Sequence, residues 1–400
     1  MHVPDGFINA HVSVAAGVVA AGAVALSLRG ARRELAGPGA RSGPSAGAGG
    51  ERTAPLAGLV AAFIFAVQML NFPVAAGTSG HLLGGALAAI LVGPYTGVLC
   101  VAVVLLMQGV LFADGGLTAL GVNITDMGVV TVLVAYGIFR LLLRLLPRGR
   151  SSVTVASFVA ALVSVPAAAV AFTGIYALGG TTDVPLGRVF AAMTGVHVLI
   201  GVGEAAITAV TVGAVIAVRP DLVHGARDFT AVPLELRTST VAVPGGGSLP
   251  RTESAGDTRA AAAAREAAPS GAAAPAARRS TRGLWLGGLA TALLCAGVVS
   301  FYASASPDGL EKVAADNGID KRAEDHAAQD SPLADYGVRD IADTRLSGGL
   351  AGVIGVGATL AAGSGVFVVV RRRRAEDAHG PVPAGAAAPA GGRPDDSGSV

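Results

Sequence analysis

Long apolar runs recur along this chain, and they contain few charged residues. Runs of about 20 residues are typical of helices that cross a membrane, because such helices pair their backbone polar groups internally. The pattern predicts an all-α fold, a polytopic membrane helix bundle of seven spans followed by a two-span accessory region. The predicted spans cover residues 8–28, 55–71, 80–93, 96–112, 119–143, 153–178, 189–218, 283–301 and 347–370.

Other segments are rich in Ala, Gly, Pro, Ser and Arg and show no periodicity, most clearly 30–54, 222–282 and 375–400. This composition is typical of flexible chain that cannot bury a core. The hydrophilic stretch 302–346 separates the last two spans and is expected on the outer face. The chain is therefore predicted to comprise a seven-span binding part (1–220), a flexible cytoplasmic linker (221–282), a two-span accessory region (283–372) and a disordered cytoplasmic tail (373–400).

The positions of the arginines predict the orientation, because short cytoplasmic loops carry an excess of Lys and Arg. Three arginines between residues 29 and 33 follow the first run. Every later basic cluster falls on the same side when the segment 80–112 is divided at Gly93-Pro94, where helix-breaking residues stand. We therefore predict a multi-pass protein of the cell membrane with its N-terminus outside and its C-terminus in the cytoplasm.

The first residues differ from a cleaved signal peptide. Apart from His2, no basic residue precedes the first apolar run, and Asp5 lies near the start. A signal peptide, by contrast, opens with a positive segment. We expect the mature chain to begin with Met1 and His2 on the outer face.

Composition narrows the classes of function. The chain is 52% hydrophobic and 14% charged, with a net charge of +2 and a mean hydropathy of +0.61. Soluble domains are about 25% charged and nucleic-acid binders are usually basic, so both classes are excluded. Cys100 and Cys295 lie inside apolar runs, and neither Lys312 nor Lys321 lies in a phosphate-binding loop. No disulfide framework, cysteine metal site or ATP-binding loop is expected.

His2 offers a specific metal chemistry. A free Met1 amine, the His2 amide nitrogen and the His2 ring can close fused chelate rings around one ion, and one further nitrogen would complete a planar set. Such tetragonal nitrogen coordination suits Ni(II) and Cu(II), and Co(II) remains a candidate. The alternative is that His2 is simply a polar residue near the chain end.

His81 is a candidate for the further nitrogen. Pro73, Gly77 and Gly80 precede it and predict a non-helical segment between two spans, which is tolerated at membrane depth where it lines a cavity or is buried in protein. The alternative is a hydrogen-bonded histidine that begins a helix.

His197 and Glu204 lie seven residues apart in one predicted span, about two helical turns, and so share a face. Ionisable residues inside a membrane are costly and often functional. The pair either borders the path of a metal ion or forms a polar contact that holds helices together.

Several motifs, in this order, resemble the cobalt/nickel substrate-binding component of energy-coupling-factor (ECF) transporters, the CbiM/NikM family. The resemblance covers about residues 1–220, and the accessory region resembles a NikN-like subunit through its Pro-Asp-Gly-Leu-Glu (PDGLE) motif, within Ser306–Glu311. The motifs are Met1-His-Val-Pro-Asp-Gly-Phe7, Met69-Leu-Asn-Phe-Pro-Val74, Gly77-Thr-Ser-Gly-His-Leu-Leu-Gly84, Phe112-Ala-Asp-Gly-Gly-Leu-Thr-Ala-Leu-Gly121 and the stretch from His197 to Glu204.

The resemblance implies a metal site made by Met1, His2 and His81. The ligands would be the N-terminal amine, the amide and ring nitrogens of His2, and the ring of His81. Asn71 and Ser79 lie in the family motifs and, with His197 and Glu204, are candidates to support these ligands or to border the ion's path.

The resemblance also implies the substrate and the partners. Ni²⁺ or Co²⁺ would be the transported substrate rather than a bound cofactor, and the PDGLE motif favours nickel. Two ECF ATPase subunits and a transmembrane coupling (T) subunit would be separate chains, and the ATPase subunits would hydrolyse the ATP. Membrane lipid would surround the protein, and no nucleic-acid partner is expected.

Two other classes of function stay open at this stage. An intramembrane metal-dependent enzyme would use His197 and Glu204 as an acid–base pair, but the spans offer no convincing nucleophile or open metal site. A structural scaffold would use the linkers to tether other subunits. The loop 302–346 either attracts cations or docks on the binding part through its acidic residues, or it is a solvated linker. These acidic residues are Asp308, Glu311, Asp316, Asp320, Glu324, Asp325, Asp330, Asp335, Asp340 and Asp343.

Overall fold

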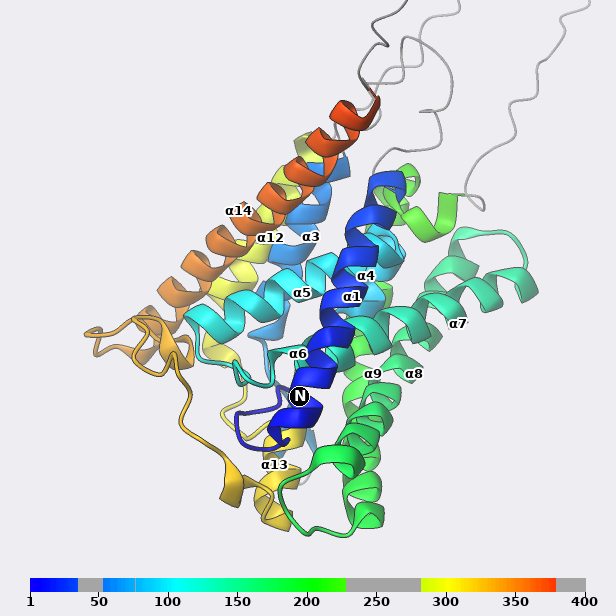
Figure 1. Cartoon of the computed structure of the whole chain (residues 1–400). Coiled ribbons are helices and arrows are strands. Elements are labelled where there is room, and N and C mark those ends of the chain that lie inside the picture. The colour runs from blue at the N-terminus through cyan, green and yellow to red at the C-terminus, as the bar shows by residue number, and fades with distance from the viewer. Residues whose placement is uncertain (35–52, 76, 228–281, 379–400) are drawn as a thin grey trace, which may run out of the picture.

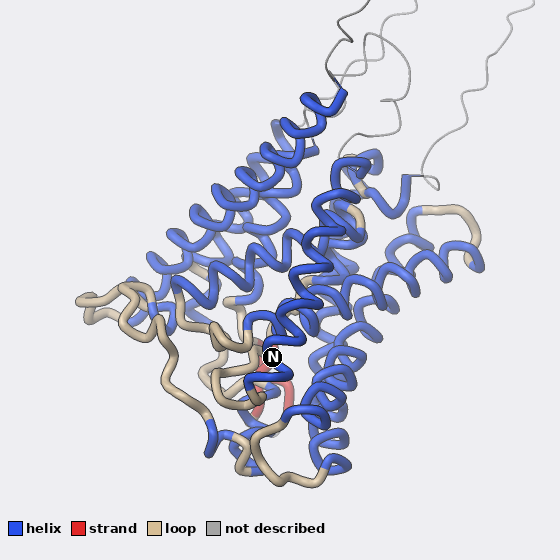
Figure 2. The backbone as a smooth tube through the Cα atoms, viewed as in Figure 1, coloured by secondary structure: helices blue, strands red, loops and turns tan. Residues whose placement is uncertain are grey.

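The computed structural model describes residues 1–34, 53–75, 77–227 and 282–378. Helices dominate it, and a short antiparallel hairpin of β1 (Phe72–Ala75) and β2 (Thr78–Gly80) lies near the N-terminus (Figure 2). The helices of the binding part are α1 (Ala10–Glu34), α3 (Thr53–Gln68), α4 (Gly85–Val92), α5 (Pro94–Leu111), α6 (Leu120–Asn123), the π-helix η1 (Ile124–Val130), α7 (Thr131–Leu145), α8 (Arg150–Gly179) and α9 (Leu186–Val218).

Two 3₁₀ turns, η2 (Pro220–Leu222) and η3 (His224–Ala226), follow α9. The accessory region contains α12 (Arg282–Gly297), η4 (Val299–Tyr302), α13 (Gly309–Asn317), η5 (Asp320–Arg322), η6 (Ala334–Tyr336) and α14 (Thr344–Ala378).

The predicted class of fold, an all-α membrane helix bundle, is confirmed. Within the described residues, seven helical segments are long and apolar enough to cross a membrane. Five belong to the binding part and two to the accessory region. They are Ala10–Glu34, Pro94–Leu111, Leu120–Leu145, Arg150–Gly179, Leu186–Val218, Arg282–Tyr302 and Thr344–Val370.

Two of the predicted spans are shorter than expected. In place of a span over 80–93 the chain forms the end of β2, an extended turn and the eight-residue helix α4, which is about 12 Å long against a hydrocarbon core of about 30 Å. Every residue of α4 is buried, so surrounding helices rather than lipid enclose it. Helix α3 has 16 residues and is also short for a span. The expected break is present, because Gly93 has φ +100° and Pro94 opens α5.

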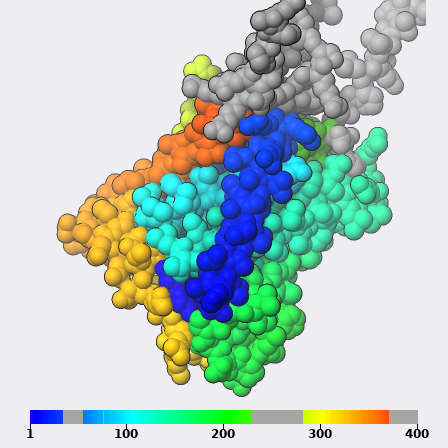
Figure 3. Space-filling view, viewed as in Figure 1, coloured from blue at the N-terminus to red at the C-terminus, as the bar shows by residue number. Residues whose placement is uncertain are grey.

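The two ends of the bundle differ in character. At one end the Glu34 carboxylate, which closes α1, accepts hydrogen bonds from the backbone nitrogens of Tyr95 and Thr96 at the start of α5. The N-terminus, the hairpin and the accessory loop lie together at the opposite end (Figure 1). In Figure 3 the accessory loop, coloured yellow to orange, borders the blue N-terminal segment at that end.

Parts of the predicted linker and tail are folded. Residues 220–226 include η2 and η3, with Val223 and Ala226 fully buried, and Gly225 packs directly against Phe139 of α7. Helix α14 continues to Ala378, beyond the predicted start of the tail. The remainder of the predicted linker (228–281) and tail (379–400) lies outside the described residues.

The accessory helices pack on the binding part through α3, which lies beside α12 and α14 (Figure 1). The contacts are close because small residues face each other. A Cβ at Gly355 of α14 would lie 2.2 Å from the Phe65 ring of α3, and one at Gly58 would lie 2.4 Å from Ser364 Oγ. This packing brings the accessory loop to the end of the bundle that holds the N-terminus.

Candidate metal centre

The N-terminal segment runs into the bundle and is buried there. Met1 is 2% exposed and Val3 is fully buried. Asn123 at the end of α6 fixes Val3 on both sides, since its Oδ1 accepts from the Val3 nitrogen (2.8 Å) and its Nδ2 donates to the Val3 carbonyl (3.2 Å). An amide side chain that pairs both backbone groups holds the extended chain end at one depth.

Asp5 and Gly6 shape the turn that follows. The Asp5 carboxylate accepts from the backbone nitrogen and hydroxyl of Thr118, at 2.8 and 2.5 Å. Gly6 has φ +85°, and a Cβ there would lie 2.0 Å from the Arg322 carbonyl oxygen, so no other residue fits without a shift. The first motif of the chain therefore places the amine of Met1 inside the protein.

The hairpin positions His81. Gly77 has φ +74° between the two strands, and His81 follows β2 directly, with 5% exposure. Its Nδ1 lies 3.0 Å from the Leu82 carbonyl oxygen, which only accepts. Nδ1 therefore carries the ring hydrogen, and Nε2 presents its lone pair to the site.

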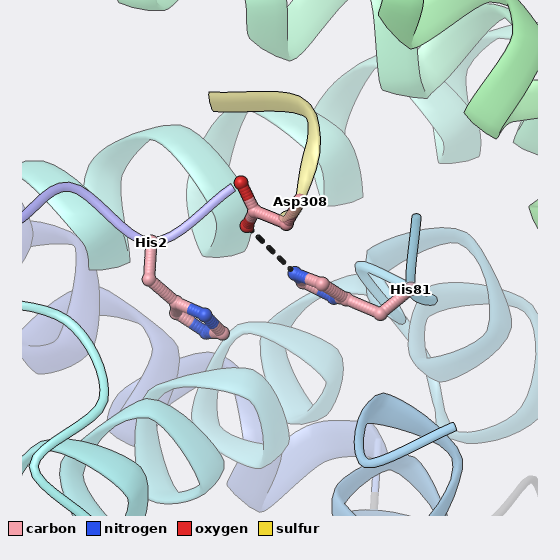
Figure 4. Close-up of side chains that lie close together, drawn as sticks. All are labelled: His2, His81 and Asp308. Atoms are coloured by element: carbon pink, nitrogen blue, oxygen red, sulfur yellow. Dashed lines mark ion pairs between the residues drawn. The ribbon is translucent and has the colours of Figure 1, made fainter. Parts of the chain in front are cut away.

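Three donor atoms meet at the chain end. The Met1 amine lies 2.7 Å from His81 Nε2 and 2.6 Å from Asp308 Oδ2, and these two partners lie 3.6 Å apart. Figure 4 shows His81 and Asp308 facing each other, with His2 beside them. Ligand atoms of His2, His81 and Asp308 all lie within 4.8 Å of one another. The structure thus brings together the three residues that the resemblance implies, and adds a carboxylate from the accessory region.

The ring of His2 stacks on that of His81, with centroids 5.1 Å apart and planes 9° from parallel. His2 Nδ1 lies 2.9 Å from Asp114 Oδ1, while the buried Nε2 has no hydrogen-bond partner among the described residues. Asp114 is held in turn by Tyr336 of the accessory region, whose hydroxyl donates to Oδ2 at 2.5 Å. An unpartnered buried nitrogen is costly and rare, so this orientation of the His2 ring leaves one polar atom unsatisfied.

Charge in the site is set by burial and by these contacts. Burial lowers the pKa of His81, and the neighbouring Met1 ammonium lowers it further. Burial by itself would raise the pKa of Asp308, but the ammonium and His81 hold it well below its usual range. At Asp114, contacts with His2 and Tyr336 likewise outweigh burial and lower the pKa to about 2. Neutral imidazole beside ionised carboxylates suits a divalent cation.

A cavity of about 690 Å³ opens beside the site, and Asn71 is part of its wall. Its charged lining residues are mainly acidic, with Arg345 as the one arginine among the described residues, and a wall with an excess of one charge sign concentrates ions of the opposite sign. The acidic residues that line it are Asp5, Asp114, Asp308, Glu311, Glu324 and Asp335.

His197 and Glu204 do not hydrogen-bond to each other. His197 Nδ1 pairs with the Met193 carbonyl oxygen at 2.7 Å within α9, and its buried Nε2 has no partner among the described residues. The Glu204 carboxylate accepts from the backbone nitrogens of Leu83 and Gly84 at 2.6 and 3.1 Å. Glu204 therefore holds the turn that precedes α4 (Gly85–Val92), and neither side chain is arranged as the acid–base pair of an enzyme.

This role of Glu204 in holding the turn before α4 gives a test. We expect Glu204→Ala to lower the stability of the purified protein by about 2–4 kcal/mol, because two buried amides lose their acceptor. Glu204→Gln, which keeps one carbonyl oxygen, should cost less. Thermal unfolding in detergent measures both, and an unchanged midpoint in Glu204→Ala would contradict the role.

Several residues of the site carried no distinct signal in the sequence. Asp114 lies in one of the motifs, but the sequence does not indicate its contact with His2, and Asn123 and Tyr336 lie outside the motifs. Asp308 was one acidic residue among ten in the accessory loop. Its position directly before α13, inside the PDGLE motif, was the available signal.

Comparison with known proteins identifies the family to which the chain belongs. A family model described as "Cobalt uptake substrate-specific transmembrane region" (CbiM) matches residues 2–222, and a PDGLE domain matches residues 282–372. The chain is 40% identical over 223 residues to a putative metal transport protein of Haloquadratum walsbyi, covering 56% of this chain and 93% of that protein. It is 38% identical over 226 residues to a putative fused nickel transport protein NikMN of Archaeoglobus fulgidus, covering 56% of this chain and 68% of that one.

A solved structure of a truncated transition metal transporter is 26% identical to the chain with a TM-score of 0.44, and the match covers 54% of this chain and 99% of that one. The CbiM model matches more than half of the chain, which confirms the resemblance seen in its motifs. The chain therefore belongs to the family of cobalt uptake substrate-specific transmembrane regions: it is a cobalt/nickel transport component of the CbiM/NikM type, not an enzyme, and it carries a PDGLE domain in its C-terminal part.

Proposed function

We propose that this protein captures Ni²⁺ or Co²⁺ at the outer face of the cell membrane through its own N-terminus. The ligands are the Met1 amine, the amide and ring nitrogens of His2, and Nε2 of His81. The observation that carries this proposal is the 2.7 Å distance between the buried Met1 amine and His81 Nε2. Two ligand atoms on one ion at about 2.1 Å each lie about 3 Å apart when they are neighbours.

Capture requires a change at His2. Fused chelate rings through the amine and the amide end at Nδ1 of the same histidine, and this nitrogen now faces Asp114. The ion therefore replaces the Asp114 contact, and the ring of His2 turns toward Met1. The four nitrogens then form the planar set that Ni(II) favours, with Co(II) as the second candidate.

Import by the ECF mechanism would place metal binding and ATP hydrolysis on separate chains. The arginines that close α1 and those that follow α9 lie at the end of the bundle opposite the N-terminus (Figure 1), which supports a cytoplasmic location for that end and an outer location for the site. Neither Lys312 nor Lys321 lies in an ATP-binding loop, so two ATPase subunits and a T subunit would power transport as separate chains.

The direct experiment is equilibrium binding of Ni²⁺ and Co²⁺ to the purified full chain with a native N-terminus. The proposal expects one ion per chain and competition between the two metals. A chain that binds neither ion, or that binds several ions weakly, would contradict it.

The accessory region has a predicted effect on transport. Removing residues 283–400 should leave a folded bundle, since the matched region makes up 93% of the Haloquadratum relative, but uptake should fall severalfold because the accessory loop reaches the site. Cellular uptake of radioactive nickel at equal expression measures this. An uptake rate equal to that of the full chain would show that the region is dispensable.

A further inference from the structure

The PDGLE motif reaches the candidate metal centre, and the contacts of its residues hold it there. Ser79 of β2 holds the segment before it, since the Ser79 nitrogen donates to the Pro307 carbonyl at 2.8 Å and the hydroxyl donates to the Ser306 carbonyl at 2.7 Å. Gly309 lies against α9, where a Cβ would come within 2.8 Å of Ile200 and 3.1 Å of the His197 ring. Leu310 is fully buried.

Asp308 and Glu311 form a capping box at the start of α13. Asp308 Oδ1 accepts from the Glu311 nitrogen at 2.8 Å, and the Glu311 carboxylate accepts from the Asp308 nitrogen at 2.9 Å. One oxygen of Asp308 is therefore committed to the helix. The other, Oδ2, is left facing the Met1 amine and His81 Nε2.

The three donor atoms already have the spacing of ligands around one ion. Oδ2 lies 2.6 Å from the amine and 3.6 Å from Nε2, and the two nitrogens lie 2.7 Å apart. Neighbouring ligands on a common ion at about 2.1 Å are separated by about 3 Å. A donor above the plane of the four nitrogens would lie close to both the amine and Nε2. Oδ2 of Asp308 is close to both of these atoms.

The buried charges at the site also favour a contact between Asp308 and the ion. Before an ion binds, the Asp308 carboxylate pairs with the Met1 ammonium at a buried position. An amine that coordinates a metal has given up its proton, so the carboxylate would lose its partner. A buried charge without a partner is strongly unfavourable, and the arriving divalent cation is the charge that replaces the ammonium.

We propose that Asp308 of the accessory region is an oxygen ligand of the captured ion, adding a fifth donor above the plane of four nitrogens. This inference rests on the proposed function, since it assigns a further ligand to the same site. It makes the accessory region part of the binding site rather than a neighbour of it, and it explains why a loop more than two hundred residues away in sequence is docked there.

The test uses the full chain with a free N-terminus, loaded with Co²⁺ or Ni²⁺, and two substitutions. Asp308→Asn and Asp308→Ser both keep a good N-cap for α13, and Ser is too short to reach the ion. Asp316→Asn is the matched control, because it removes one carboxylate from the same helix at an exposed position paired with Lys312.

The electron paramagnetic resonance spectrum of the Co(II) protein reports a donor above the plane, because that donor acts on the orbital that holds the unpaired electron. We expect Asp308→Ser to change this spectrum and both Asp308 variants to raise the Kd for Ni²⁺ about 10- to 100-fold. Asp316→Asn should leave both unchanged. If Asp308→Ser has the wild-type spectrum, Asp308 only pairs with the ammonium of the ion-free protein, and the proposal is overturned even where the affinity falls.

An N-terminally extended wild-type chain separates this proposal from the proposed function. If that chain binds Co²⁺ with the native spectrum, or if the native chain binds no ion, the N-terminal site itself is wrong and the Asp308 proposal falls with it. If the native chain requires its free N-terminus but Asp308→Ser has an unchanged spectrum, only the Asp308 proposal fails.

Discussion

A short peptide added before Met1 should abolish high-affinity binding of Ni²⁺ and Co²⁺, weakening it by about a thousandfold or more. The extension converts the amine into an amide and separates His2 from the chain end, so the fused chelate rings cannot form in the same geometry. It also has no room, because Met1 is 2% exposed and its nitrogen contacts His81 and Asp308. Equilibrium dialysis of the purified proteins measures the effect.

A protease-cleavable extension provides the control. Cleavage that leaves Met1 as the first residue should restore binding within the same preparation, and a tag at the C-terminus should have no effect. Tight nickel binding by the uncleaved protein, with the spectrum of the native one, would exclude the amine as a ligand even if the protein still supported transport.

His81→Ala should also abolish high-affinity binding while the protein still inserts into the membrane. Losing one of four nitrogens should cost about 3 kcal/mol or more, which corresponds to about a hundredfold in affinity. His81 makes few other contacts that would unfold the bundle, since its polar partners are the Met1 amine, Asp308 and the Leu82 carbonyl. Calorimetric titration with Ni²⁺ and with Co²⁺ tests both metals.

His11→Ala is the matched control, because it removes the same side chain from an exposed position on α1. Its affinity for both ions should equal that of the native chain. Retention of wild-type affinity by His81→Ala, in a protein with a normal thermal unfolding profile, would remove His81 from the site.

The features that depend on a local signal follow from the sequence. Apolar length predicts the membrane helices, and Gly93-Pro94 predicts the break between α4 and α5. The predicted span over 80–93 is wrong, because a run of apolar residues looks the same whether lipid or protein surrounds it. Only the packing of other helices around α4, and Glu204 at the turn before it, allow an eight-residue helix to lie inside the bundle.

The pairing of His197 with Glu204 was open in the sequence for a related reason. A spacing of two turns places both side chains on one face of α9, but it does not say what that face meets. In the structure Glu204 meets the backbone of Leu83 and Gly84, and His197 lies against Gly309 of the accessory region.

The sequence by itself determined the membrane class and the family, and it singled out His2 and His81 as candidate metal ligands, because each of these depends on residue type and short spacing. The tertiary structure decided that the Met1 amine meets Asp308, 307 positions away, and that Tyr336 reaches Asp114 across 222 positions. Ten acidic residues in one hydrophilic loop are equivalent until the loop docks. Docking depends on the close contacts of α12 and α14 with α3, and these bring one carboxylate to the chain end.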